Sequence, residues 1–166
     1  MIFFTATANN WQALFEDNSI KNILINSMEW LVKNNKAKIH AFVIMPNHIH
    51  IIWSLLEEDY DVATSFKSYT ATMIRKHLIK NDNNKLKTYI STQKDRTYNF
   101  WKRRSKSIEI MNRNIADQKI EYIHNNPLQE KWELVDLPED YYYSSASFYI
   151  ANKTDFKFLT RYEDWI

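Results

Sequence analysis

The sequence predicts an α+β fold, namely a ferredoxin-like or RRM-like antiparallel β-sheet with its helices packed mainly on one face. Segments with strand and helix patterns follow each other in the order β-α-β-β-α, and further sheet and helix come after them. The 166 residues contain no repeat and no Pro- or Ser-rich linker, so we expect a single domain over residues 1–166. Such a sheet would leave one face free for a ligand.

The first two expected elements are a strand and a helix. Residues 2–7 are rich in Phe and Thr, which favours a short strand. A helix is expected next, because apolar residues recur at helical spacing from Ile20 to Leu31. Asp17 or one of its neighbours can cap the start of this helix, and the polar run 33–36 ends it.

A β-hairpin and a second helix follow. Residues 39–45 and 49–55 are β-branched or aromatic at most positions and are separated by a Pro-Asn pair, which indicates a hairpin. Apolar residues at helical spacing from Val62 to Leu78 predict the second helix.

The rest of the chain is less regular. Residues 82–110 are basic and suggest loops and a strand. A third helix is expected over roughly residues 115–125, because an asparagine can cap its start and Pro127 disfavours helical geometry just before itself. Residues 128–166 form an aromatic and acidic tail that we expect to pack on the same domain.

Composition excludes several classes of protein. Without cysteine the chain has no disulfide, no thiolate metal site and no cysteine nucleophile. Without glycine it has no P-loop and no dinucleotide-binding fingerprint, because both need glycine where the backbone approaches phosphate. No signal-peptide pattern and no 18-residue apolar run occurs, so we expect a cytoplasmic protein without membrane contact.

Charge is distributed unevenly along the chain, although the net charge is only +2. Between Lys67 and Lys106 there are twelve basic and two acidic residues, interleaved with aromatic ones. Cations that bind phosphates and rings on which bases stack are together typical of a nucleic-acid surface. A solvated lysine-rich surface would have the same charge, so charge alone leaves both interpretations open.

The second strand of the hairpin begins with two histidines, His48 and His50. Because side chains alternate along a strand, both imidazoles face one side of the sheet. Two imidazoles on one face form half of a divalent-metal site, and two structural histidines at a strand end are the alternative. His40 and His77 have no such partner in the pattern, so we interpret both as structural or surface residues.

Tyr122 is a candidate nucleophile on the third helix. At about 100° per residue it lies off the apolar stripe of Ala116, Ile120 and Ile123, so its hydroxyl faces polar neighbours. Tyrosine is a competent covalent nucleophile when a cation favours the phenolate, and Lys119 or a bound metal could supply that charge. A surface tyrosine without a catalytic role fits the same pattern.

Four motifs, taken together, resemble those of a known family. They are the run Ala41–Trp53 with Met45-Pro46-Asn47-His48-Ile49-His50, the Phe100-Trp101 pair before a basic run, Tyr122-Ile123-His124-Asn125-Asn126-Pro127, and Pro138-Glu139-Asp140-Tyr141 leading to Tyr143-Ser144-Ser145. In this combination and order they resemble the REP-associated tyrosine transposases, of the single-tyrosine HUH superfamily of single-strand DNA endonucleases. The resemblance covers most of residues 1–150.

The resemblance implies a ferredoxin-like fold, His48 and His50 as ligands of Mg²⁺ or Mn²⁺, and Asn126 at the position of the third ligand. It implies that Tyr122 cleaves single-stranded or hairpin DNA during transposition and leaves a 5′-phosphotyrosine and a free 3′ hydroxyl. Because the phosphotyrosine retains the energy of the broken bond, the resemblance also implies that strands are rejoined without ATP. From charge and aromatic character, the residues expected to contact DNA are Arg75, Lys76, Trp101, Lys102, Arg103, Arg104 and Lys119.

Two other functions stay open. One is a non-catalytic module that binds single-stranded nucleic acid, as a domesticated transposase would. The other is a metal-dependent phosphodiesterase that activates water and forms no covalent intermediate. The DNA sequence recognised stays open as well, as does the choice between a monomer and a homodimer.

Overall fold

The computed structural model describes residues 1–165 and contains a four-stranded antiparallel sheet in the order β2-β3-β1-β4. The strands are β1 (Ile2–Thr7), β2 (Ala37–Ile44), β3 (His48–Leu55) and β4 (Lys106–Glu109). One helix connects β1 to β2 and another lies between β3 and β4. This is the βαββαβ arrangement of a ferredoxin-like fold, so the expected fold class is confirmed.

The helices are α1 (Asn18–Lys33), α2 (Val62–Asn81), α3 (Asn83–Lys87), α4 (Arg113–His124) and α5 (Ala146–Ile150). Asp17, Asp61 and Asn112 accept backbone N–H groups at the starts of α1, α2 and α4, as helix caps do. The sequence analysis did not anticipate α3, a five-residue helix. Among the described residues, no helix combines the length and the apolar character needed to cross a bilayer.

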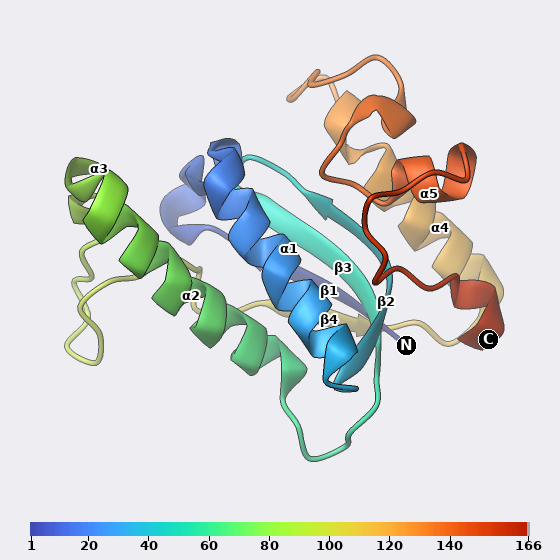
Figure 1. Cartoon of the computed structure of the whole chain (residues 1–166), viewed down its shortest axis with the longest axis horizontal. Coiled ribbons are helices and arrows are strands. Elements are labelled where there is room, and N and C mark those ends of the chain that lie inside the picture. The colour runs from blue at the N-terminus through green and yellow to red at the C-terminus, as the bar shows by residue number, and fades with distance from the viewer. Residues whose placement is uncertain (166) are drawn as a thin grey trace.

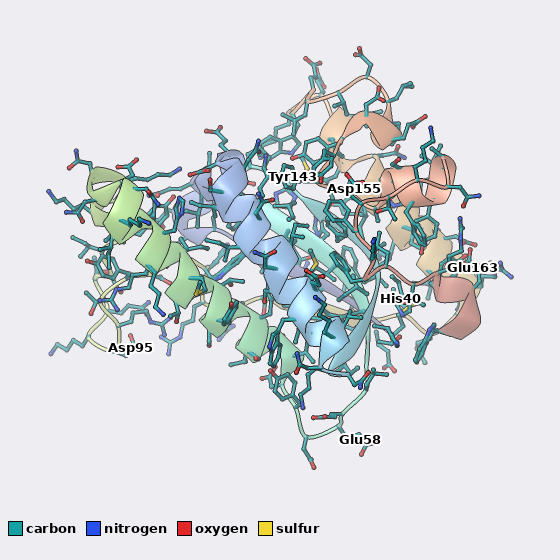
Figure 2. All side chains as sticks on the ribbon, viewed as in Figure 1. His40, Glu58, Asp95, Tyr143, Asp155 and Glu163 are labelled. Atoms are coloured by element: carbon teal, nitrogen blue, oxygen red, sulfur yellow. The ribbon has the colours of Figure 1, made fainter. Side chains whose placement is uncertain are left out.

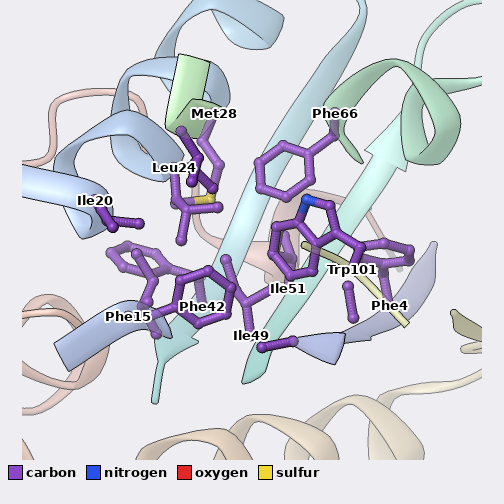
Figure 3. Close-up of a cluster of buried hydrophobic side chains, with 14 of the residues drawn as sticks. Phe4, Phe15, Ile20, Leu24, Met28, Phe42, Ile49, Ile51, Phe66 and Trp101 are labelled. Atoms are coloured by element: carbon purple, nitrogen blue, oxygen red, sulfur yellow. The ribbon is translucent and has the colours of Figure 1, made fainter. Parts of the chain in front are cut away.

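The larger hydrophobic core lies between the sheet and the pair α1 and α2, which run across the same face (Figure 1). Figure 3 shows part of this core, where Phe15, Phe42, Phe66 and Trp101 surround the centre of the sheet. The two longest helices therefore share one face, as the sequence predicts.

The opposite face of the sheet carries α4, which lies beyond the sheet in Figure 1. Ala116, Ile120 and Ile123 of α4 belong to a second core cluster together with Phe3 and Val43 of the sheet. β2 and β3 are buried at nearly every position, which is typical of strands covered on both faces. The face expected to be free is therefore partly occupied, and a ligand there must lie beside α4.

The chain after α4 runs along the outer edge of β2. The amide of Ser145 donates to the carbonyl of Phe42, and that of Thr160 donates to the carbonyl of Ile39, both at 2.9 Å. The tail thus supplies partners for the main chain of an edge strand, which would otherwise stay open. β4 forms the other edge, and its four residues are exposed.

Candidate active site

His48 and His50 lie at the start of β3, on the face of the sheet that α4 covers. In the strand register His48 is opposite Thr7 and His50 is opposite Thr5 of β1. The two imidazole rings are 4.8 Å apart, centroid to centroid. The alternation of side chains along β3 places both rings on one side, as the spacing predicts.

Asn47 fixes the orientation of the first imidazole. Its Oδ1 lies 2.7 Å from His48 Nδ1, while its Nδ2 donates to the carbonyl of Trp11 at 3.3 Å. A carbonyl can only accept, so the Trp11 contact defines which end of the Asn47 amide carries the N–H groups. His48 Nδ1 must therefore donate to Oδ1, and its Nε2 keeps a free lone pair.

His50 is held in a similar way by Thr5, whose Oγ1 lies 2.8 Å from His50 Nδ1. The Nε2 atom of His50 is buried and has no hydrogen-bond partner among the described residues. Histidines that bind metals usually engage one ring nitrogen with the protein and offer the other to the ion. Both rings of this pair are held by Nδ1, so Nε2 is the atom left for a ligand.

Asn126 brings a third polar side chain to the pair. It begins the 3₁₀ turn Asn126–Leu128 directly after α4, and it is 1% exposed. Within the part of the chain that the structure describes, neither its Oδ1 nor its Nδ2 has a hydrogen-bond partner. A buried amide without partners is costly. It lies beside His48, and its polar side chain raises the pKa of that imidazole against the larger effect of burial.

Tyr122 approaches the same place from α4. Its ring centroid is 5.2 Å from that of His50 and 6.2 Å from that of Phe3. The side chain is 44% exposed, so a substrate can reach it from solvent. The fold thus brings together Tyr122, both histidines and Asn126, which come from two separate motifs of the sequence.

Burial keeps both imidazoles neutral at neutral pH. Desolvation lowers the pKa of His48 to about 4. It lowers the pKa of His50 to about 3, and the nearby charges of His48 and Lys119 act in the same direction. Neutral imidazoles are the form that can donate a lone pair to a metal ion.

The donor atoms fit a small divalent cation. No cluster of three or more His, Cys, Asp or Glu side chains occurs among residues 1–165, so any ion here would depend on the two imidazoles and an amide. The orphaned His50 Nε2 and Asn126 Oδ1 are buried acceptors that such a cation would satisfy. Nitrogen and oxygen donors suit Mn²⁺ and, with water completing the shell, Mg²⁺.

Two of the expected DNA contacts lie close to this site. The amide of Lys102 donates to the carbonyl of Thr7 at 2.7 Å, next to the strand position of His48. Lys119, one turn before Tyr122 on α4, has its Nζ 5.1 Å from the centre of the Phe3 ring. The main chain of Lys102 and the ammonium of Lys119 therefore both lie near the histidine pair.

Arg75 and Lys76 lie elsewhere. They are exposed residues of α2, which packs on the opposite face of the sheet from the histidines. The structure therefore does not bring them to the candidate site. The guanidinium of Arg75 instead lies 5.5 Å from the centre of the Tyr98 ring.

Trp101 is not on the surface, and its assignment as a DNA contact is wrong. Its indole is 4% exposed and packs 5.0 Å from the Phe15 ring, centroid to centroid. Its Nε1 donates to the hydroxyl of Thr70 at 3.1 Å. A bridge between Ala8 and Trp101 joins the basic segment to the end of β1 and leaves this ring in the core (Figure 3).

The basic loop after Trp101 is exposed and lies over a surface hollow of about 300 Å³. Lys67 Nζ donates to the carbonyls of Lys102 and Arg103, which fixes the loop against α2. Arg103 lines the hollow, and Arg104 follows it as an exposed residue. In Figure 2 the loop that bears Asp95 lies at the end of the molecule opposite Glu163, near the end of the tail.

Several residues near the site were missed by sequence reasoning. Thr5 was missed because its contact depends on strand register, whereas Asn47 could have been chosen as the neighbour of His48 in the motif. The other three are Trp132, Trp11 and Lys131. The Trp132 ring is 6.0 Å from the His48 ring, centroid to centroid, and the Lys131 ammonium is 5.9 Å from the centre of the Trp11 ring. No periodic signal marks these last three.

His40 and His77 lie away from the histidine pair. His40 is buried, with Nε2 2.9 Å from the Ser54 hydroxyl and Nδ1 3.1 Å from the carbonyl of Thr160. His77 lies on α2, with Nε2 3.5 Å from a carboxylate oxygen of Asp17.

Comparison with known proteins finds similarity to solved structures only. No family model matches the chain, and no curated protein matches it. A REP-associated tyrosine transposase bound to a REP hairpin is 22% identical, with a TM-score of 0.64 over 90% of this chain and 78% of that one. A putative transposase from Deinococcus radiodurans R1 is 15% identical, with a TM-score of 0.44 over 75% of this chain and 88% of that one. At the level of the fold, the first likeness agrees with the resemblance carried by the motifs.

Proposed function

We propose that this chain belongs to the REP-associated tyrosine transposases and cleaves and rejoins single-stranded DNA through a tyrosine nucleophile. The observation that carries the proposal is the approach of Tyr122 to His50, 5.2 Å between ring centroids, across the boundary between α4 and the sheet. Motifs that are distant in the sequence meet there. The shared fold with a transposase that was solved with a REP hairpin supports DNA as the substrate.

In the proposed reaction, His48, His50 and Asn126 would hold a divalent ion, Mg²⁺ or Mn²⁺. The ligand atoms would be the Nε2 atoms of the two imidazoles, whose Nδ1 atoms contact Asn47 and Thr5, and Asn126 Oδ1, which has no hydrogen-bond partner among the described residues. When bound, the ion would supply Lewis-acid polarisation of a non-bridging oxygen of the scissile phosphate. Asn47 and Thr5 keep the two imidazoles in place through their Nδ1 atoms, so that no reorganisation is needed when a substrate arrives.

Tyr122 Oη would attack the phosphorus atom of the scissile phosphodiester. A bond forms between Oη and phosphorus, the bond between phosphorus and the 3′ oxygen breaks, and the phenolic proton passes through water to that 3′ oxygen. The products are a 5′-phosphotyrosine and a free 3′ hydroxyl. Because one phosphoester replaces another, the hydroxyl of a second strand can reverse the step without ATP.

The Lys119 ammonium would stabilise negative charge on the reacting atoms of the site. It lies one helical turn before Tyr122 and near enough to His50 to lower the pKa of that imidazole. A cation at this position stabilises negative charge that develops on the phosphate and on the phenol oxygen.

The test uses single-stranded oligonucleotides with randomised sequence, with and without a hairpin, incubated with the protein and Mn²⁺ and analysed on a denaturing gel. A 5′-phosphotyrosine keeps the downstream fragment on the protein, so a 3′ label should move with the protein and a 5′ label should appear in a free, shortened strand. Tyr122→Phe should abolish both products. Tyr142→Phe is the matched control, because Tyr142 is exposed on the tail and contacts Tyr143 and Phe156, away from the histidines.

Each other outcome identifies a different function. A covalent band that persists in Tyr122→Phe would eliminate this nucleophile. Cleavage with no covalent band would indicate a metal-dependent phosphodiesterase that uses water. Binding with no cleavage in Mn²⁺ or Mg²⁺ would indicate a single-strand binding module.

A further inference from the structure

We propose that the indole of Trp11 is a stacking platform for one unpaired nucleotide base beside the candidate active site, and that Lys102 and Lys131 bind the phosphates that flank this base. The inference rests on the proposed function, because it states where that site holds its single strand. Trp11 belongs to none of the motifs that carry the family resemblance.

Trp11 differs from the buried tryptophans of this chain in its exposure. It is 57% exposed at the surface, whereas Trp101 is 4% exposed within the core. An exposed aromatic ring next to cations is the combination with which proteins bind single strands, since every base has a π-face and every nucleotide a phosphate. The ring that sequence reasoning sought at Trp101 is therefore present at Trp11.

Two lysines from distant segments converge on this ring. Lys102 Nζ is 5.1 Å from its centroid and Lys131 Nζ is 5.9 Å from it. Neither lysine forms a salt bridge with a carboxylate among the described residues, so both charges are available to an anion. A base that stacks on the indole would take the place of a lysine, and the released ammonium would then be near the phosphate of the same nucleotide.

A series of contacts connects the platform to the metal-ligand candidates. Lys131 Nζ also lies 5.0 Å from the centre of the Trp132 ring, and that ring is 6.0 Å from the ring of His48. In addition, the amide of Lys102 donates a hydrogen bond to the carbonyl of Thr7, the strand partner of His48. A base on Trp11 therefore belongs to a nucleotide close to the scissile phosphate.

The backbone holds the indole in an unusual position. Asn10 and Trp11 have φ angles of 54° and 57°, in the left-handed region that residues with a Cβ atom avoid. The conformation is kept by the bond from the Trp11 amide to the carbonyl of Ala8, 3.1 Å, and by the bond from Asn47 Nδ2 to the carbonyl of Trp11. Asn47 also holds His48, so the platform and the metal-ligand candidate are positioned by one side chain.

The test measures binding by fluorescence anisotropy in the Tyr122→Phe background, where the proposed nucleophile is absent and the probe should stay intact. The probes are a labelled oligothymidylate and an abasic oligomer of the same length, which has the same phosphates but no bases. Trp11→Ala should weaken binding of the oligothymidylate about 5- to 100-fold and leave binding of the abasic oligomer unchanged. Trp11→Phe should retain most of the affinity, and Trp11→Leu, which is apolar without a π-face, should lose as much as Trp11→Ala.

Trp30→Ala is the matched control, because Trp30 is 49% exposed near the end of α1 and is not among the rings that have a cation over them in the described chain. Equal weakening of both probes by Trp11→Ala, or no weakening of either, would overturn the platform. If the parent protein binds neither probe, the proposed function fails together with the inference. If it binds both probes independently of Trp11, the inference alone fails.

Discussion

Truncation of Trp101 to alanine should lower the free energy of unfolding by about 3–5 kcal/mol, the usual cost of removing a buried tryptophan ring. The structure supports the full effect, because the indole packs on Phe15 and lies 6.2 Å from the Phe66 ring, centroid to centroid. Its Nε1 also donates to Thr70, and the loss of that bond accounts for about 1 kcal/mol of the total. For a chain of this length, about 3–5 kcal/mol corresponds to a fall in Tm of roughly 6–20 °C.

Trp101→Phe separates the two contributions. It keeps an aromatic ring in the core and removes the N–H group, so we expect a loss of about 1–2 kcal/mol. The hydroxyl of Thr70 stays satisfied in this variant, since it also donates to the carbonyl of Phe66 at 2.7 Å. Urea unfolding followed by circular dichroism measures both values, and an unchanged m-value shows that the denatured state is the same.

Trp11→Ala is the control for this series, because an exposed ring should change stability by no more than about 0.5 kcal/mol. The reasoning would be refuted if Trp101→Ala unfolded at the same urea concentration as the parent protein and yet lost affinity for single-stranded DNA. That result would make Trp101 a DNA contact and the core assignment wrong.

Two further predictions concern pH and salt. In protein treated with a chelator, the free energy of unfolding should fall as the pH drops below about 6.5. Burial lowers the pKa of His48 to about 4 and that of His50 to about 3 in the folded protein. Because the same imidazoles have a higher pKa in the unfolded chain, the unfolded chain takes up protons first and is stabilised. Each histidine should cost up to about 1.4 kcal/mol per pH unit in urea unfolding, and equal stability at pH 7 and pH 5 would contradict the burial of these rings. Arg103→Ala and Arg104→Ala should each make the salt dependence of binding to a single-stranded oligonucleotide less steep. The negative slope of log affinity against log salt concentration should shrink in magnitude by about 0.7 for each arginine removed. An unchanged slope would show that the arginine in question contacts no phosphate.

Most of the fold could be predicted because each long element has a clear local pattern. β1, the hairpin of β2 and β3, and the helices α1 and α2 all occur close to their expected ranges. The five-residue helix α3 is too short to show a period. The tail could not be placed, since it contacts β2 through isolated bridges such as that between Val43 and Ser144, which depend on tertiary structure.

The candidate site was predictable where alternation or helical spacing defines a face, as for His48, His50 and Tyr122. Thr5 could not be inferred, because its bond to His50 requires the register between β1 and β3. Trp101 was misassigned because an aromatic residue in a basic run looks the same in the sequence whether its ring points into the core or into solvent.

Because the tail covers the outer edge of β2, a strand from another molecule cannot extend the sheet at that edge. Within the described residues, the tail already occupies that border, so unpaired main-chain groups remain along β4. Two copies that met there around a two-fold axis passing between Ser107 and Ile108 would place Lys106 of one opposite Glu109 of the other, a pairing of opposite charges. Such a pair would share one continuous sheet, with β4 of each copy at its centre.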